Sequence, residues 1–236
     1  MAVVRFIFII ILTCIFDTSH SQNPLNQLDS NGERHGAWKK NFNNTDQPRY
    51  EGQFEHGKEV GLFKFYTLVR GKSSLSATKQ FNKINHTAQV KFYSSKGKLI
   101  SEGMMDKKKY VGNWVYYHNK SDAIMTKEYY NVNGKLEGER TVFYENGKVA
   151  EVANYKDGKL EGSSKWYSEN DVLLKEFHYQ NDELHGPANY YDADGELVAE
   201  GRWHHDAKTG VWNYYRDGEL FESKDFTKYS KNPKKQ

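Results

Sequence analysis

Cysteine is almost absent from this sequence of 236 residues. The one cysteine, Cys14, lies in an apolar run near the start, so we expect no disulfide and no thiol chemistry in the rest of the chain. An excess of one charge is also lacking: 34 basic and 31 acidic residues give a net charge of +3, which does not indicate a nucleic-acid-binding protein. Hydrophobic residues make up only 37%, yet aromatic residues reach 15%. This composition does not suit a deep aliphatic core and favours a thin sheet covered with rings.

A glycine recurs through the chain about every 24 residues, and this repeat organises the sequence. About eight units fit between residues 30 and 226. We call the recurring residues the marker glycines; one unit has Ala88 in their place. The marker glycines are Gly36, Gly61, Gly112, Gly138, Gly162, Gly186 and Gly210.

Each unit contains two short runs in which apolar and polar residues alternate, as in β-strands. The runs are separated by turn sequences such as Asp157-Gly158 and Asn146-Gly147. Such pairs predict type I′ turns, in which both central residues have positive φ. One hairpin cannot bury its apolar face alone, so neighbouring hairpins must stack. The sequence therefore predicts an all-β fold: an elongated, single-layer antiparallel sheet of about eight β-hairpin repeats.

Residues 1–21 have the features of a secretory signal peptide. Arg5 precedes an apolar run that is too short for a membrane-spanning helix of ~20 residues, and small residues precede a cleavage site near Ser21. The alternatives are a lipoprotein acylated at Cys14 and an uncleaved anchor. We expect a protein that is secreted, or exported to the periplasm or cell envelope. Residues 22–29 are then a polar lead-in, residues 30–226 the repeat domain, and residues 227–236 a basic C-terminal tail.

The segment from Tyr50 to Gly61 has the spacing Tyr-x-Gly-x-aromatic-x-x-Gly-x-x-x-Gly and resembles the MORN repeat. The resemblance spans residues 30–226. Most units lack the first Tyr-x-Gly, so the chain looks more like the shorter variant found in many bacterial secreted and antitoxin-like proteins. This resemblance implies an elongated antiparallel β-repeat sheet with a binding or assembly role, and no common enzymatic activity.

A tyrosine recurs beside the turn in most units, and this tyrosine row is the candidate binding surface. Tyrosine has an apolar body and a polar tip, so an exposed row can bind a peptide, a partner sheet or a sugar. The alternative is that each ring packs on its neighbour and braces the turn. The row consists of Tyr66, Tyr93, Tyr117, Tyr144, Tyr167, Tyr191 and Tyr215.

Histidine and glutamate offer the remaining candidates for chemistry. His204-His205-Asp206 is the most ligand-like cluster, but neighbouring side chains on a strand point to opposite faces, so we expect no shared metal. The default interpretation of this segment is a solvated turn. Glu102, Glu176 and Glu200 occupy equivalent places, which favours cross-strand pairs with lysine over the paired carboxylates of a glycosidase. The sequence contains no recognisable catalytic motif. We therefore predict no enzyme, no cofactor and no metal.

The sequence as a whole predicts an exported, non-catalytic scaffold that binds an unidentified protein partner. The partner would bind at the tyrosine row, at the irregular segment 67–88 or at an open end of the sheet. A homodimer can form through unpaired edge strands. The alternatives are a cell-envelope binder of glycans or lipid headgroups, and an antitoxin-like neutraliser of a partner protein. A membrane surface is the less favoured partner, and no nucleic acid is expected.

Overall fold

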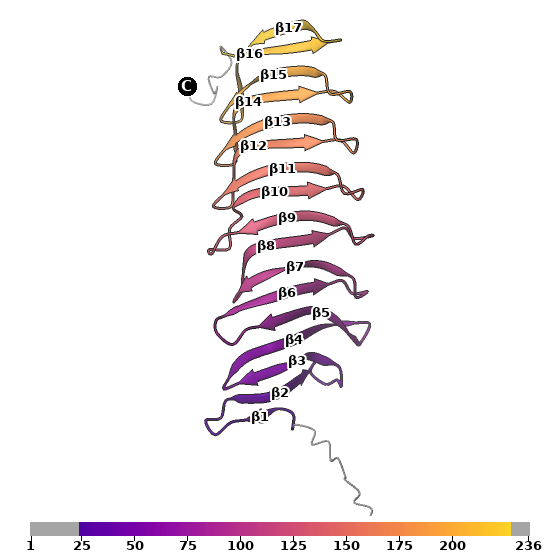
Figure 1. Cartoon of the computed structure of the whole chain (residues 1–236), viewed down its shortest axis with the longest axis vertical. Coiled ribbons are helices and arrows are strands. Elements are labelled where there is room, and N and C mark those ends of the chain that lie inside the picture. Colours follow the sequence, from indigo (N-terminus) through magenta and orange to yellow (C-terminus); the bar gives the residue numbers. More distant parts are fainter. Residues whose placement is uncertain (1–23, 228–236) are drawn as a thin grey trace, which may run out of the picture.

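The computed structural model describes residues 24–227 as one antiparallel sheet of 17 strands (Figure 1). Each strand pairs with the strands before and after it in the chain, so β1 and β17 lie at opposite ends of a long ladder. The all-β hairpin-repeat fold predicted from the sequence is confirmed. The strands are β1 (Gln27–Leu28), β2 (Arg34–Asn41), β3 (Pro48–Glu55), β4 (Lys58–Val69), β5 (Lys72–Phe81), β6 (Thr87–Tyr93), β7 (Leu99–Asp106), β8 (Lys109–Tyr117), β9 (Ile124–Tyr130), β10 (Gly138–Phe143), β11 (Val149–Lys156), β12 (Lys159–Tyr167), β13 (Leu173–Gln180), β14 (Glu183–Tyr191), β15 (Leu197–His204), β16 (Ala207–Arg216) and β17 (Glu219–Asp225).

The predicted signal peptide, residues 1–21, lies outside the described residues, as does all but the first residue of the predicted tail, residues 227–236. The sheet begins inside the predicted lead-in, residues 22–29, because Gln27 and Leu28 form β1 and pair with β2. Within residues 24–227, no helix is long and apolar enough to cross a membrane.

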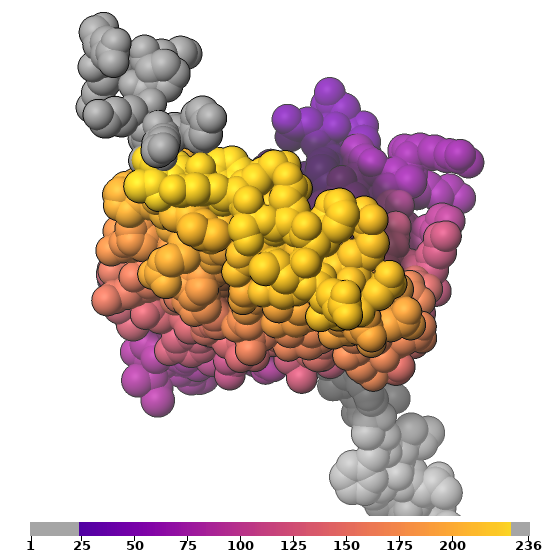
Figure 2. Space-filling view, turned by 90° about the horizontal axis from the view of Figure 1, so that it is seen from above, coloured from indigo at the N-terminus to yellow at the C-terminus, as the bar shows by residue number. Residues whose placement is uncertain are grey.

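The two ends of the sheet differ. At one end, β1 has two residues. At the other end, β17 pairs with β16 alone among the described strands and exposes Leu220 (58%) and Phe221 (60%). Figure 2 looks onto this end, in yellow. An edge of this kind can pair with a second copy, and the homodimer stays a prediction that sedimentation measurements would test.

Five of the seven marker glycines, Gly61, Gly112, Gly162, Gly186 and Gly210, lie at bulges where the register between neighbouring strands shifts. Gly112 has φ 67° and lies where the register between β7 and β8 shifts, so three residues of β8 oppose one of β7. A side chain is strained at positive φ, which explains why glycine recurs at this place. In the unit with Ala88, β5 and β6 pair without a register shift. The bulge is therefore missing from the unit that lacks the glycine.

These bulges place a large ring on a glycine of the neighbouring strand, which gives a single-layer sheet its core. Three such rings are completely buried. A Cβ atom added to the glycine beneath would lie 2.2–2.5 Å from ring atoms, so no other residue fits there without a shift. The pairs are Phe63 on Gly52, Trp114 on Gly103 and Trp212 on Gly201.

Charged side chains interrupt the core near the middle of the sheet. Arg140 on β10 contacts Glu128 on β9 at 3.1 Å and Glu151 on β11 at 3.5 Å, and we call these three residues the charged seam. The Glu128 side chain is only 11% exposed and also accepts a hydrogen bond from Tyr130 at 2.8 Å. The seam lies where β9 and β10 share two register pairs, between one hydrophobic cluster on β6–β8 and another on β13–β16.

The turns fall into two classes, and only one has the predicted conformation. At Asp157-Gly158 both residues have positive φ, 50° and 86°, as expected for a type I′ turn. At Asn146-Gly147 only the glycine does, with φ 84°, so the type I′ prediction is wrong there. Two backbone hydrogen bonds close a longer loop around this glycine. A longer loop of this kind needs positive φ at its last residue only.

Candidate functional site

Six of the seven tyrosines in the predicted row occupy equivalent places in the structure. Each follows directly after a register shift and is partly buried. Tyr144 is the exception, because the shift in β10 precedes Phe143, which takes the place of the row residue. Tyr144 begins the next loop, and its hydroxyl donates a hydrogen bond to the carbonyl oxygen of Tyr167 at 2.6 Å. The equivalent residues are Tyr66, Tyr93, Tyr117, Tyr167, Tyr191 and Tyr215.

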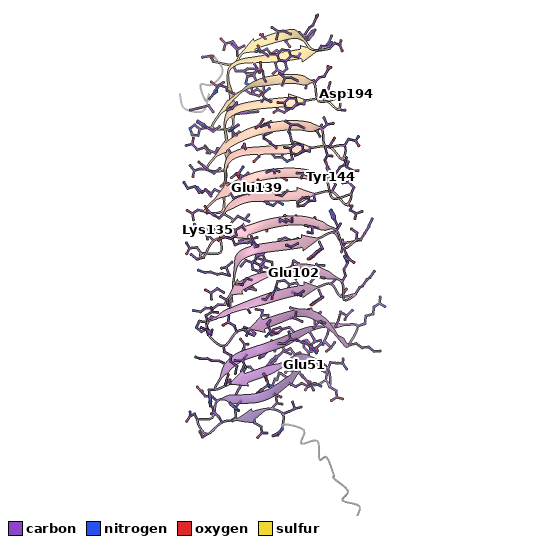
Figure 3. The ribbon with its side chains drawn as sticks, viewed as in Figure 1. Glu51, Glu102, Lys135, Glu139, Tyr144 and Asp194 are labelled. Carbon is purple, nitrogen blue, oxygen red and sulfur yellow. The ribbon has the colours of Figure 1, made fainter. Side chains whose placement is uncertain are left out.

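Three row tyrosines donate their hydroxyl hydrogen bond to a glutamate on the preceding strand. Tyr66 binds Glu51 at 2.6 Å, and Tyr117 binds Glu102 at 2.5 Å; Figure 3 labels both glutamates. In the third pair, Tyr215 binds Glu200 at 2.6 Å. These hydroxyls are engaged inside the protein. The structure therefore shows the row bracing the sheet at three places, and its use as a binding surface stays a prediction.

The hydrogen bonds shift the acidity of both partners. Hydrogen bonds from Tyr117 and then Lys91 hold the pKa of Glu102 below its ordinary value of 4.5. The hydrogen bond to Glu102, together with burial, raises the pKa of Tyr117 to about 12. The carboxylate is therefore ionised and the phenol protonated at neutral pH. Neither pKa lies near 7, so this hydrogen bond has the character of a structural contact and not of an acid–base pair in catalysis.

The predicted ladder of glutamate and lysine is present in two of three places. Glu102 lies 3.0 Å from Lys91, and Glu176 lies 3.3 Å from Lys165. Glu200 instead accepts hydrogen bonds from Tyr215 and from an asparagine on β16. The three carboxylates belong to three different strands, β7, β13 and β15, and each is paired within its own hairpin or with an adjacent strand. This arrangement matches cross-strand pairing in a sheet.

A groove of about 780 Å³ opens on the aromatic side of the sheet, across β3–β5 and the turn between β7 and β8. Phe54, Phe65 and Phe81 line it, and Phe54 is almost completely buried. Six basic side chains and one carboxylate, Glu59, also line it, and we call it the basic groove. The basic side chains are Arg34, Lys58, Lys79, Lys83, Lys107 and Lys108.

One side of the groove is the segment between β5 and β6, which lies in the region 67–88 that we expected to be irregular. Residues 67–81 are regular, because they belong to the long hairpin of β4 and β5. Only residues 82–86 form a loop, and the Oδ1 atom of Asn82 organises it by accepting hydrogen bonds from the backbone N–H groups of Ile84 and Asn85. The N–H of Lys107 donates to the carbonyl oxygen of His86 at 3.3 Å, which ties this loop to the β7–β8 turn.

Two cations of the groove lie against its rings. The guanidinium of Arg34 lies 5.0 Å from the centre of Phe54, and the Nζ atom of Lys79 lies 5.9 Å from the centre of Phe65. Basic side chains with apolar stems on rings combine an apolar floor with a positive rim. Because the whole chain carries only +3, the excess of basic groups in this groove is local. The arrangement suits a ligand that carries both carboxylates and apolar groups.

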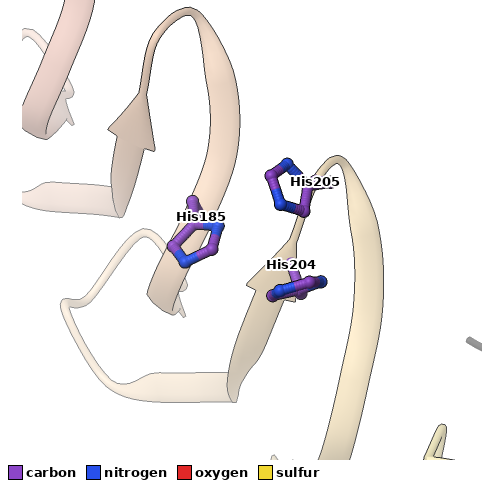
Figure 4. A group of neighbouring side chains, drawn as sticks. All are labelled: His185, His204 and His205. Atoms are coloured by element: carbon purple, nitrogen blue, oxygen red, sulfur yellow. The ribbon is translucent and has the colours of Figure 1, made fainter.

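The second feature of interest is a group of three histidines. The prediction that His204 and His205 point apart is wrong, because β15 ends at His204 and His205 belongs to the turn, with φ 48°. Their ring centres lie 4.4 Å apart, and the ring of His185 on β14 lies 5.0 Å from His204 and 5.2 Å from His205 (Figure 4). We call these residues the histidine trio.

This architecture is that of an open β-hairpin repeat protein, in which each unit packs on the next. The MORN repeat variant family matches residues 136–157 and 160–181, which are the units of β10–β11 and β12–β13, so the chain contains repeats of this family. The resemblance predicted from the sequence is confirmed for these units. MORN repeats are generally associated with protein or membrane-lipid interaction.

Other comparisons add little. No curated protein matches the chain. Among solved structures, a mutant of S. aureus TarM in complex with Fondaparinux, alpha-GlcNAc-glycerol and UDP is similar over 48% of this chain. The match covers 19% of that chain, with 16% sequence identity and a TM-score of 0.19. This likeness is too weak to bear on fold or function.

Proposed function

We propose that the chain is an exported, non-catalytic scaffold that binds a partner protein by holding an acidic segment of it in the basic groove. The observation that carries this proposal is the lining of the groove: six basic side chains and one carboxylate around three phenylalanines. An acidic segment with an apolar residue complements both parts, because its carboxylates face the rim while the apolar side chain covers the rings.

The groove is a better candidate than the tyrosine row. Three row hydroxyls already donate to glutamates, so a ligand would have to break these hydrogen bonds or use the ring faces alone. The groove cations that lie on rings, Arg34 and Lys79, have no carboxylate partner among the ion pairs of the described residues. They can therefore bind an incoming carboxylate without losing an internal one.

Export is the second part of the proposal, and it depends on residues 1–21. We expect the protein recovered from its own cells to begin at Gln22 and to be found outside the cytoplasm. Mass spectrometry of the isolated protein measures both its first residue and, after fractionation, its location. A chain that keeps residues 1–21 in a soluble cytoplasmic fraction would contradict export and leave the groove proposal untouched.

The test of binding is capture of a partner on the immobilised protein, followed by elution with salt. Lys107→Glu/Lys108→Glu reverses two exposed charges of the groove in the turn between β7 and β8, and we expect the variant to fold. We expect this variant to hold the captured acidic protein at least about tenfold more weakly, because like charges then face each other. Elution at moderate salt is expected for the wild type, since the rim charges are exposed.

A matched control is Lys96→Glu/Lys120→Glu, which reverses two exposed charges outside the groove. This control should bind like the wild type. The proposal is wrong if the groove variant and the wild type bind the captured protein equally. Retention of anionic vesicles or of an acidic polysaccharide, with no protein captured, would also overturn it in favour of the membrane or glycan alternative.

A further inference from the structure

We propose that the histidine trio, His185, His204 and His205, binds a divalent transition metal of the class that favours imidazole, such as Zn²⁺. One nitrogen from each ring can be chosen so that all three lie within 4.8 Å of one another (Figure 4). Zn²⁺ binds histidine nitrogen at about 2.0–2.1 Å, so nitrogens around one ion lie within about 4 Å of each other. The rings of His204 and His205 are exposed, so they are free to rotate toward a shared ion.

One feature of His205 is common among metal-ligating histidines. Its Nδ1 atom forms a hydrogen bond with the Oε2 atom of Glu183 at 2.5 Å. When Nδ1–H donates to this carboxylate, the lone pair of the ring is on Nε2, where a metal can bind. A carboxylate behind a ligating histidine fixes the tautomer and raises the basicity of the ring. Glu183 therefore orients His205 without itself being one of the three ligands.

His185 provides an independent observation. Its Nδ1 atom is buried and has no hydrogen-bond partner among the described residues. A buried polar atom without a partner costs free energy, and such atoms are few in folded proteins. A metal ion bound at this nitrogen would satisfy it. The unsatisfied nitrogen and the carboxylate-bound ring thus belong to the same cluster.

Two hydrogen bonds, one to a side-chain carboxylate and one to a backbone carbonyl, hold the cluster together in the absence of a metal. The N–H of Leu184 donates to the Oδ1 atom of Asp206 at 2.7 Å, and the N–H of Asp206 donates to the carbonyl oxygen of Leu184 at 3.1 Å. Leu184 precedes His185, and Asp206 follows His205. The two hydrogen bonds therefore fix the turn beside β14 and keep the rings near each other, so little ordering is needed on binding.

The repeat supplies a natural control at the other end of the sheet. His35 directly precedes a marker glycine, as His185 does, and His56 begins the next turn, as His205 does. The third residue of this cluster is Asp29, whose Oδ2 atom bonds His56 at 2.6 Å and whose Oδ1 atom accepts two backbone N–H groups. Glu55 stands in place of the third histidine. Asp29, His35 and His56 meet the same distance criterion as the histidine trio, but both oxygens of Asp29 already accept hydrogen bonds, so this cluster has two histidines where the trio has three.

The test is titration of the metal-free full-length protein with Zn²⁺ alone, by calorimetry, and with Co²⁺, whose visible spectrum reports its ligands. We expect one Zn²⁺ per chain. His204→Gln should weaken binding by about 100-fold and abolish the Co²⁺ spectrum, and Glu183→Gln should weaken it by about tenfold, as loss of an orienting carboxylate does. Because His204 and His205 are exposed, far-UV circular dichroism should show that these variants fold.

The matched control, His35→Gln/His56→Gln, should leave stoichiometry and affinity unchanged. The proposal is wrong if Zn²⁺ shows no saturable binding, if His204→Gln binds like the wild type, or if the control removes the site. Partner capture by the basic groove is measured separately, so either proposal can fail without the other.

Discussion

Replacing Gly103 by alanine tests whether the core consists of rings packed on glycines. The new Cβ atom would lie 2.4 Å from the Cδ2 atom of Trp114, far below van der Waals contact. The ring has little room to move, because it is completely buried and its Nε1–H donates to the carbonyl oxygen of Met104 at 2.9 Å. A tryptophan buries roughly 200 Å², so its full expulsion would cost about 5 kcal/mol at about 25 cal/mol per Å². We expect Gly103→Ala to cost about 3–5 kcal/mol, between overpacking and expulsion.

Two further variants separate the clash from other effects of losing a glycine. Gly112→Ala introduces a side chain at φ 67° with no atom within 4 Å, so it should cost only about 1–2 kcal/mol of backbone strain. Trp114→Ala should cost about 3–5 kcal/mol. Once the ring is gone, adding Gly103→Ala should cost almost nothing more, because the new methyl group then occupies part of the cavity.

Urea denaturation followed by circular dichroism gives the stabilities, and hydrogen exchange of β7 and β8 gives the local effect, since a repeat array can unfold in parts. The reasoning is refuted if Gly103→Ala costs no more than Gly112→Ala. It is also refuted if the double variant is clearly less stable than Trp114→Ala.

Other predictions concern the charged groups. Arg140→Met leaves the two carboxylates of the charged seam without their cation, so it should cost about 3 kcal/mol and most reduce exchange protection in β9 and β10; an unchanged urea midpoint would contradict this. Because Tyr117 and Lys91 lower the pKa of Glu102, their stabilisation is present above pH 4.5 and is lost as the pH falls through the lowered pKa. Between about pH 6 and pH 3, the wild type should therefore lose more stability in urea than Glu102→Gln, and equal losses would count against the contact. The pKa of Tyr66 is raised to about 12 by burial and by its glutamate, so its stabilisation is present below pH 10 and is lost as the pH rises through about 12. Tyr66→Phe should show a smaller alkaline loss in the same measurement, and an unchanged one would contradict the contact.

The fold could be predicted from the sequence because the information is local. A glycine with positive φ, a turn pair and a period of two all act within one unit, and each unit repeats them. The sequence also contains the information that Tyr144 does not belong to the row. Phe143, and not Tyr144, lies five residues after a marker glycine, as Tyr66 lies five residues after Gly61. The second aromatic residue of each doublet is a poor guide to the row here, because β10 ends at Phe143 and Tyr144 lies in the following loop.

The two candidate sites depend on contacts between units, which no local pattern reveals. His205 lies at the same place in its turn as Asp157 does in its own, so the turn at this segment is predictable, but the approach of the His204 and His205 rings is not. Their third partner, His185, comes from the previous strand. The basic groove likewise joins Lys79 to Lys107, and their proximity depends on a loop whose length follows no repeat. Its local charge was concealed by the near-neutral balance of the whole chain.

Because the described strands pair only with their neighbours in the chain, distance along the molecule is counted in hairpins. The basic groove includes β5 and the histidine trio includes β15, so ten strand spacings of about 4.8 Å separate them by on the order of 50 Å. Adding or deleting one hairpin between them would change this separation by about 10 Å without touching a residue of either site. The number of hairpins between the two sites therefore sets the distance between them.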